Sequence, residues 1–553
     1  IRAVQPAGQH GKCGERFASD AENHSPQKDD GGKGTKFDPK NLFEELMMKN
    51  KRFLWKKLRD NRGSLLIISY LVIFVLLALG AAFIAMSVNE SRIAERQRRT
   101  TLTLHIAEAG IERALYDLRQ DFINDASSPS WADGDINGMT IGPDTASFYS
   151  TGYGSTSLNS GSYAVQLKNV SGISDSIWIR STGTLGDVQQ TIEVYAKIIN
   201  LSPWNNAIFA GAGAAGAMVN GNVNIRGSVH ILGTGLLSTD LVVDLGGTAE
   251  IIGNNYKDMA ADLKAKVPAL PTTTVNGETV ETLGAVLRVK RGIIGLSGYA
   301  TAGETDAAGN AYKETIDAAY VTDGYGGSQG TANVHSDNGS SNAYDLGDTV
   351  SFPSLSDPYG GYSTYQGYLE ANALVINSAA DLTTLANITP NSNFSFSSAK
   401  GSIGMDGSGN MTVSGIVYID NGGSLNMLKS GSDKTITYTG SGAILTEGNV
   451  QINTNLLTSG NNSFPTNILG IMTPNTIGFN EANIDVMGLF YAEDTVRVQK
   501  QTDIVGTIVS NYFDVGTNVP SIYQVPDIIN HLPAGLIGQN ASWVMKTVSW
   551  RKI

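Results

Sequence analysis

The segment ADGDINGMTIGPD places oxygen-bearing side chains at alternating positions, which are Asp133, Asp135, Asn137 and, at the twelfth place of the loop, Asp144. This spacing matches the calcium-loop pattern D-x-[DN]-x-[DN]-G-x5-E, with aspartate in place of the final glutamate. Carboxylate and amide oxygens are the ligands that a hard cation prefers, so calcium is the one cofactor that the sequence suggests. Pro143 and the preceding stretch SSPSW argue against flanking helices, and a plain Asp/Gly/Asn turn is the alternative.

Residues 296–368 are rich in Gly, Tyr, Asp and Ser. A tyrosine ring combines a broad apolar face with a polar hydroxyl, which suits stacking on sugar rings. An exposed loop of this composition could contact surface carbohydrate through Tyr320, Tyr325, Tyr359, Tyr362 and Tyr365. The alternative is a long insertion or flexible loop without a binding role.

The sequence contains no clear catalytic arrangement. The histidines after residue 46 are His105, His230, His335 and His531, and they lack metal-ligand spacing. Paired carboxylates on stacked coils could act on a polysaccharide, and the candidates are Asp406, Asp420, Asp485 and Asp503. Aspartate is also common at such corners because its side chain bonds to the backbone. We therefore predict that the protein is not an enzyme.

A long apolar run precedes all of these residues. Residues 65–86 contain no charge, and as a helix they measure about 33 Å, enough to span a bilayer. Residues 49–62 carry seven basic residues and a single acidic one. This asymmetry predicts a cytoplasmic N-terminus, with the chain after residue 87 across the membrane.

The helical pattern continues past the apolar run. Apolar residues recur on one helical face at Leu104, Ala107, Ile111, Ala114, Leu115, Leu118 and Phe122. The sequence therefore predicts one helix over about residues 64–122, with half of it in lipid and half outside.

These features together resemble the type IV pilin-like proteins, in particular minor pilins with a PilX-type N-terminus. The resemblance rests on a basic leader (residues 47–63), on Arg62-Gly63-Ser64, and on an apolar helix that runs into ESRIAERQR and AEAGIERAL. It implies that a prepilin peptidase cuts between Gly63 and Ser64 and that the helix is kept as an inner-membrane anchor and filament core. It also implies other pilins and the pilus assembly machinery as partners.

One residue departs from the major pilins, which carry a glutamate five residues into the mature helix. This chain has Ile68 there, as the PilX-like branch tends to. The departure puts in doubt a role that needs the buried carboxylate for repeated subunit register. An ordinary single-pass anchor with a helical stalk is the alternative.

Residues 1–46 are polar, Gly-rich and without periodicity, which predicts disorder or a segment outside the native chain. They contain the single cysteine, Cys13, so no disulfide is expected in the exported part. Residues 100–553 hold 21 basic and 40 acidic residues, a net charge of −19. This charge argues against nucleic acid as a partner.

Residues 123–200 predict a small antiparallel sheet, because YAVQLKNVS, IWIRSTGTLG and VQQTIEVYAKII alternate apolar and polar residues. The resemblance implies that this sheet is a pilin-like head. From residue 201 to 535, Gly, Asn, Ser, Thr and β-branched residues dominate, with the insertion-like stretch 296–368 between the two ends. Residues 536–553 are left as a C-terminal tail.

Repeats within this second region favour a solenoid. Residues 485–502 and 503–520 align over 18 positions, with Asp485 on Asp503 and Gly488 on Gly506. Similar glycine-plus-strand units begin near Gly415, Gly442 and Gly470. The expected fold class is therefore α+β with a right-handed parallel β-helix, and a β-sandwich is the alternative.

Two functions from different classes follow from this organisation. The first is a minor pilin-like surface protein that enters or initiates a type IV pilus-like filament and displays the solenoid for adhesion or assembly. The second is a membrane-tethered protein that binds or degrades polysaccharide on a β-helix. In both cases the C-terminal domain is expected in the periplasm or outside the cell.

Overall fold

The computed structural model describes residues 64–124, 135–136, 139–140, 145–150, 155–170, 173–214, 218–219, 223–348, 350–432, 434–515, 520–538 and 543–553. The chain divides into two units, Ile1–Arg96 and Gln97–Ile553. In the first unit the described part is the beginning of helix α2 (Ser64–Asn124), which has 61 residues.

The first half of α2 is apolar and exposed. Its side chains from Leu65 to Ile93 include leucines, isoleucines, valines and phenylalanines that are about half exposed or more. Among the described residues, α2 is the one helix long and apolar enough to cross a membrane, with a mean hydropathy of 2.8 over its most apolar window. A helix that leaves such a surface uncovered in water is stable only when lipid or another protein covers it.

The second half of α2 packs on an antiparallel sheet. The sheet has the order β3-β5-β6-β7-β34, and its strands are β3 (Tyr149–Ser150), β5 (Gly161–Val170), β6 (Ile173–Leu185), β7 (Val188–Asn200) and β34 (Trp543–Lys552), with β4 (Thr156–Leu158) beside β5. Ala107, Ile111 and Leu118 of the helix are buried against alternate residues of the strands, among them Leu167, Ile179 and Val194. Gly183 allows this close approach, because a Cβ there would meet the helix backbone at Thr103 and Ala107. The predicted helix-plus-sheet layout is confirmed.

The last strand of this sheet comes from the C-terminal end of the chain. β34 pairs antiparallel with β7, from Trp543 opposite Asn200 to Lys552 opposite Ile192. Residues 201–542 are therefore inserted between two neighbouring strands of one sheet. This edge strand lies within residues 536–553, the stretch for which the sequence predicts only a C-terminal tail.

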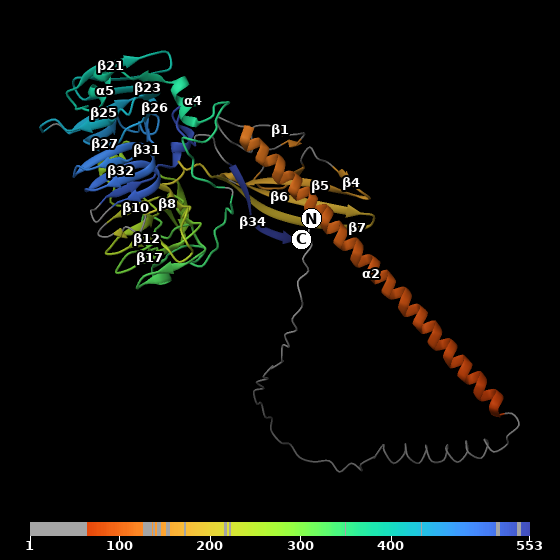
Figure 1. Ribbon diagram of the computed structural model, residues 1–553. Helices are drawn as coiled ribbons and strands as arrows, with labels where there is room; N and C mark the ends of the chain where they lie inside the picture. The colour runs from red at the N-terminus through yellow and green to blue at the C-terminus, as the bar shows by residue number, and fades with distance from the viewer. Residues whose placement is uncertain are drawn as a thin grey trace, which may run out of the picture. The chain divides into compact units, whose positions relative to one another are not determined.

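The inserted region is built mainly from parallel strands, which we call the parallel stack (Figure 1). Its main row contains, in spatial order, β18 (Ala318–Val321), β16 (Val286–Val289), β11 (Val229–Ile231), β8 (Ile208–Gly213), β32 (Thr502–Asp514), β31 (Ile484–Val498), β29 (Ile468–Thr473), β26 (Ser441–Thr446), β23 (Asn410–Ile419) and β20 (Leu374–Ile376). All of these neighbours pair in parallel.

Further rows run beside the main one. One contains β24 (Leu425–Leu428), β27 (Val450–Asn453) and β30 (Ile477–Phe479), and another contains β25 (Thr435–Thr439) and β28 (Asn455–Thr458); both rows end on β31. At the other end lie β10 (Asn224–Arg226), β13 (Glu250–Gly253) and β33 (Ser521–Tyr523), and a separate parallel sheet of β9 (Met218–Val219), β12 (Leu241–Leu245), β17 (Ile293–Leu296) and β19 (Tyr325–Gly326).

The remaining elements are short. They are the two-residue strands β1 (Asp135–Ile136) and β2 (Met139–Thr140), the hairpins β14 (Thr272–Val275) with β15 (Glu278–Glu281) and β21 (Asn393–Ser397) with β22 (Gly401–Asp406), the helices α3 (Ala261–Lys264), α4 (Tyr365–Asn372) and α5 (Ala379–Leu385), and the 3-10 turns η1 (Gly330–Asn333) and η2 (Pro526–Asn530).

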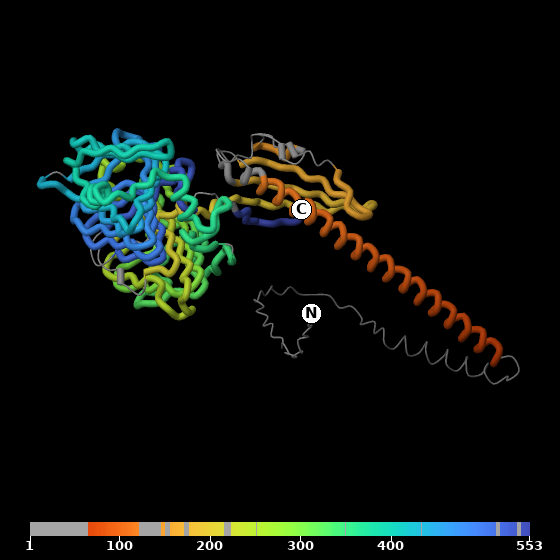
Figure 2. The backbone as a smooth tube through the Cα atoms, turned by 45° about the horizontal axis from the view of Figure 1, so that its top comes forward, coloured from red at the N-terminus to blue at the C-terminus, as the bar shows by residue number. Residues whose placement is uncertain are grey.

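The two halves of the stack meet in its middle. Along the chain, β8, β11, β16 and β18 progress to one end, residues 322–373 lead back, and the chain then continues from β20 at the opposite end to β32. There β32 pairs with β8, where the stack began. Figure 2 shows the yellow-to-green half and the cyan-to-blue half lying side by side. Both ends of the inserted region therefore lie near the middle of the stack, where Trp204 Nε1 donates to the carbonyl of Ile537 at 2.6 Å.

Side-chain alternation builds one continuous core between the rows. Leu287, Ile444, Ile471 and Ile508 are fully buried, as alternate residues of stacked strands should be. The register pairs Asp485 with Asp503 and Gly488 with Gly506, which are the residues that the 18-residue alignment matches. Gly415 pairs with Gly442 in the same way. Gly470 pairs with Ala443, so the register there differs by one residue from the predicted match of Gly470 with Gly442.

Candidate functional site

Three strands of the stack present polar side chains in one ladder. His230 on β11 is in register with Arg288 on β16, and Arg288 is in register with Tyr320 on β18. Their neighbours along each strand, such as Leu287 and Val289, are buried in the core. Because side chains alternate along a strand, the ladder residues point to the outer face.

The same ladder continues into aromatic residues. Phe209 of β8 lies in register with His230 on one side and Val509 on the other. Phe352 stacks between Phe209 and Tyr491, with ring centroids at 6.3 and 5.8 Å. The hydroxyl of Tyr491 donates to the carbonyl of Pro353 at 2.7 Å.

Residues 344–348 and 350–369 thus run along the outside of the ladder, and we call this segment the strap. All but its last residue belongs to the stretch 296–368 that the sequence marks as an insertion. Tyr344, near its beginning, bonds to His230, and Gln366, near its end, bonds to Tyr418 on β23. The strap therefore makes contacts from one half of the stack to the other.

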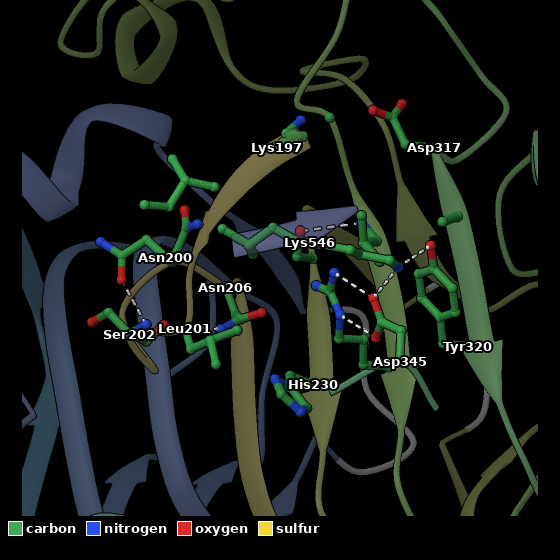
Figure 3. Close-up of a pocket in the computed structure, with 18 of the residues that line it drawn as sticks. Lys197, Asn200, Leu201, Ser202, Asn206, His230, Asp317, Tyr320, Asp345 and Lys546 are labelled. Carbon is green, nitrogen blue, oxygen red and sulfur yellow. Dashed lines mark hydrogen bonds and ion pairs between the residues drawn. The ribbon is translucent and has the colours of Figure 1, made fainter. Parts of the chain in front are cut away.

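An ion cluster lies at the polar end of the ladder. Arg288 Nε lies 3.0 Å from Asp345 Oδ1 of the strap, and Lys546 Nζ of β34 lies 2.9 Å from the other oxygen of that carboxylate. Lys546 Nζ also donates to the hydroxyl of Tyr320 at 3.2 Å. Figure 3 shows Lys546 reaching Asp345 and Tyr320 together. The cluster thereby ties the C-terminal strand to the stack.

The neighbours of Asp345 and Lys546 in this cluster favour the charged form of each side chain. Burial alone would raise the pKa of Asp345, whose side chain is only 6% exposed, but Arg288 and Lys546 hold the pKa below its usual value. The hydrogen bond to Asp345 raises the pKa of Lys546 in spite of burial, which works in the opposite direction. Asp345 and Lys546 are therefore both ionised at neutral pH.

His230 is neutral at the same pH. Burial, and secondarily the nearby Arg288, lower its pKa to about 3. Its Nε2 forms a hydrogen bond of 2.7 Å with the hydroxyl of Tyr344. Burial raises the pKa of that tyrosine, so His230 pairs with a neutral hydroxyl.

A cavity of about 770 Å³ opens beside this cluster, between β34, the end of β7 and the ladder. Figure 3 shows residues from these elements around it. Its polar lining includes Lys197, Asn200, Ser202, Asn206, His230, Arg288, Asp317, Tyr320, Asn338, Asn342, Asp345 and Lys546. Of the two carboxylates in this lining, Asp345 is bonded to both Arg288 and Lys546. A carboxylate held in this way by two cations suits binding better than proton transfer.

The expected tyrosines fall in three places. Tyr359, Tyr362 and Tyr365 come together with Tyr368, and the ring centroids of neighbours in this group are 4.6–5.7 Å apart. Tyr365 is buried and donates to the carbonyl of Leu536 at 3.0 Å, whereas Tyr362 is 39% exposed.

The other two tyrosines are engaged elsewhere. Tyr320 lies in the cavity, where Lys546 Nζ is 4.5 Å from its ring centroid and the Arg288 guanidinium is 5.6 Å from it. Tyr325 packs on the core, and its buried hydroxyl has no hydrogen-bond partner among the described residues. The prediction that these five tyrosines contact carbohydrate stays a prediction.

The calcium loop and the cleavage site fall largely outside the described residues. Asp133, Asn137, Asp144 and Gly63 are not described, Asp135 is described as the first residue of β1, and Ser64 is the first residue of α2. The described residues contain no group of three or more His, Cys, Asp or Glu that could hold a metal ion.

The four candidate carboxylates lie apart from the cavity lining. Asp406 accepts hydrogen bonds from the backbone of Ser408 and Asn410, and Asp420 from that of Asn421. Asp485 and Asp503 face each other on β31 and β32. Burial and the neighbouring Asp503 raise the pKa of Asp485 to about 6.

Sequence reasoning missed Arg288, Asp345 and Lys546. They lie up to 258 positions apart, and no local spacing connects them. The one usable signal is the alternation in VLRV (286–289), which places Arg288 on the outer face of a strand.

No family model matches the chain, and no curated protein matches it. Among solved structures, the crystal structure of the competence-associated pilin ComZ from Thermus thermophilus aligns with 82% of this chain and 97% of that chain, at 21% identity and a TM-score of 0.48.

Proposed function

We propose that this chain is a minor pilin-like subunit, inserted in the bacterial inner membrane and taken up into a type IV pilus-like filament. One observation carries the proposal: α2 leaves the apolar side chains of its first half exposed, while its second half is packed on an antiparallel sheet. A helix of this kind can be held first by lipid and later by the equivalent helices of other subunits. The proposed partners are a prepilin peptidase, other pilins and the assembly machinery, without nucleic acid.

The inserted region is the part that the filament would display. We interpret the parallel stack as a β-helix, because strands recur in several parallel rows with one continuous core. A domain of this size on every subunit would crowd a filament, so the proposed position is the tip or a sparse site. Its proposed role is adhesion or assembly, with the domain in the periplasm or outside the cell, and it includes no catalysis.

The test is N-terminal sequencing of the protein from membranes and from sheared surface material. We expect a mature chain that begins at Ser64 and is present in the sheared fraction. Gly63→Val should leave the chain uncut and confined to membranes. Gly80→Ala, in a helical position where an added Cβ meets nothing within 4 Å, is the matched control and should be processed normally. An uncut wild-type chain found only in membranes would refute the proposal.

A second candidate is a membrane-tethered enzyme that acts on polysaccharide. The observation in its favour is the stacked pair Asp485 and Asp503, because the raised pKa of Asp485 is the condition that a general acid needs. Release of new reducing ends from polysaccharide by the wild-type protein, abolished in Asp485→Asn, would support it. If the wild-type protein released no reducing ends, Asp485 and Asp503 would be a structural contact and this candidate would be rejected.

A further inference from the structure

The cavity beside β34 carries surplus positive charge. Three cations and two carboxylates line it, namely Lys197, Arg288, Lys546, Asp317 and Asp345. Asp317 is bonded to Lys313, which does not line the cavity. Among the described residues, Asp345 is the carboxylate that pairs with Arg288 and Lys546. The lining thus carries a positive charge, although the whole chain has a net charge of −12.

The two central cations retain free donors. Arg288 uses Nε and Nη2 on Asp345, and Lys546 uses its ammonium group on Asp345 and Tyr320. A guanidinium carries five N–H donors and an ammonium three. Within the part of the chain that the structure describes, neither side chain makes another hydrogen bond, so donors remain for an anionic group.

The rest of the lining suits a ligand with many hydroxyl groups. Amides and a hydroxyl line the cavity at Asn200, Asn206, Asn338, Asn342 and Ser202. Part of each amide is already used within the protein, because Asn200 Oδ1 accepts from Ser202 N and the amide nitrogens of Asn206, Asn338 and Asn342 donate to backbone carbonyls. Among the described residues, Asn200 Nδ2 and the Oδ1 atoms of Asn206 and Asn342 make no other hydrogen bond, so one amide donor and two amide acceptors remain for sugar hydroxyls. The volume of about 770 Å³ is within the roughly 300–1,000 Å³ of ordinary ligand pockets, and it exceeds what a single small anion fills.

We propose that this cavity binds an acidic oligosaccharide, with a uronate carboxylate at Arg288 and Lys546 and its hydroxyls at the amides. Tyr320 holds Lys546 in place, because the ammonium group lies over its ring and on its hydroxyl. The inference rests on the proposed display of the domain outside the inner membrane, where polysaccharide is present.

Calorimetric titration of the full-length protein in detergent tests the proposal. Tetragalacturonate is expected to bind saturably and more weakly as salt is raised, since charged contacts are screened. Maltotetraose, a neutral tetrasaccharide, should bind at least tenfold more weakly. Inorganic phosphate should not compete at concentrations equal to those of the oligosaccharide. Equal binding of the neutral sugar, or full competition by phosphate, would overturn the assignment to an acidic sugar.

Two variants locate the site. Lys546→Met and Lys197→Gln each remove one cation from the lining and should weaken tetragalacturonate binding about tenfold or more. Lys290→Gln, close to Arg288 in sequence but outside the lining, is the charge-matched control and should bind as the wild type does. If both lining variants, with melting temperatures near that of the wild type, bind normally, the site is wrong.

This test is independent of filament assembly. A chain that binds tetragalacturonate but stays uncut in membranes would refute the proposed function and leave the site standing. A chain that is cut and assembled but does not bind would refute the site alone.

Discussion

Asp485 and Asp503 sit at equivalent positions of β31 and β32, so the register places one carboxylate beside the other. Both are partly buried, and burial raises the pKa of each. The pKa of Asp485 is about 6, whereas an aspartate in the unfolded chain titrates near 3.9. The folded state therefore binds this proton more tightly than the unfolded state does.

We expect Asp485→Asn to stabilise the protein at pH 8, because ionised Asp485 destabilises the folded state above its folded pKa. The gain should be on the order of 1 kcal/mol after allowance for solvent screening. It should shrink as pH falls through 6 and vanish near pH 4, where the wild-type carboxyl is protonated in the folded state. Thermal melts between pH 4 and 8 measure this dependence.

Asp406→Asn is the control of opposite sign. Hydrogen bonds from Asn410 and from the backbone lower the pKa of Asp406, so its replacement should reduce stability at pH 8. Equal melting temperatures for Asp485→Asn and wild type at pH 8 would contradict the raised pKa of Asp485.

At the scale of the elements, glycines set how closely β31 and β32 approach. Gly488 and Gly506 pair in register, with φ of +159° and +141°. A Cβ on Gly506 would collide with the carbonyl oxygen of Gly488. The position therefore needs glycine both for the backbone conformation and for the space.

Gly506→Ala should destabilise the stack by about 3 kcal/mol or more, because strain at positive φ adds to a backbone collision. Gly460→Ala separates the two causes. Gly460 has a φ of +86° with nothing near its added Cβ, so its cost should be about 1 kcal/mol. Chemical denaturation of both variants measures the difference, and equal costs would show that the collision is relieved.

Local patterns allowed the elements to be predicted from the sequence. The helix, the antiparallel strands and the 18-residue register follow from periodicity and from glycine spacing, which depend on neighbouring residues alone. The order of strands in the stack could not be predicted in this way. The pairing of β32 with β8 joins residues about 300 positions apart, and either strand alone would fit a sheet edge equally well.

The cavity was beyond sequence reasoning for the same reason. Arg288 comes from strand β16, Asp345 from the strap and Lys546 from the last strand. In its own stretch of sequence, each is typical of a solvent-exposed charge. The sequence predicts Tyr320 as a contact for sugar, but it does not show that Arg288 and Lys546 lie near the tyrosine ring. Only the assembled ladder shows which side chains share an environment.

For the whole molecule, the joint between β7 and β34 determines how the inserted region is held. Glu193 on β7 is 1% exposed and lies between Arg180 of β6 and Arg551 of β34. Burial would raise its pKa, but these two arginines lower it, so it stays ionised. The carboxylate links three strands that come from both ends of the inserted region.

Glu193→Gln should therefore loosen the sheet at β34 and leave the stack intact. Since the arginines are 34% and 63% exposed, we expect a loss of about 1–3 kcal/mol, below the cost of breaking a fully buried pair. Differential scanning calorimetry should show a lowered transition for the sheet and an unchanged one for the stack. Lys552→Gln, on the same strand, is the control and should leave both transitions unchanged. A single transition that Glu193→Gln lowers as a whole would contradict the separate unfolding of sheet and stack.

The insertion between β7 and β34 also bears on mechanical strength. A pull on the inserted region would reach the sheet through Asn200 and Trp543, which face each other at the same end of the two strands. The tension would then run along both strands, so the hydrogen bonds of β34 would resist in shear together rather than open one at a time. If β34 slipped out, the backbone through β7 would still connect the two parts, and the subunit would yield in two stages without parting.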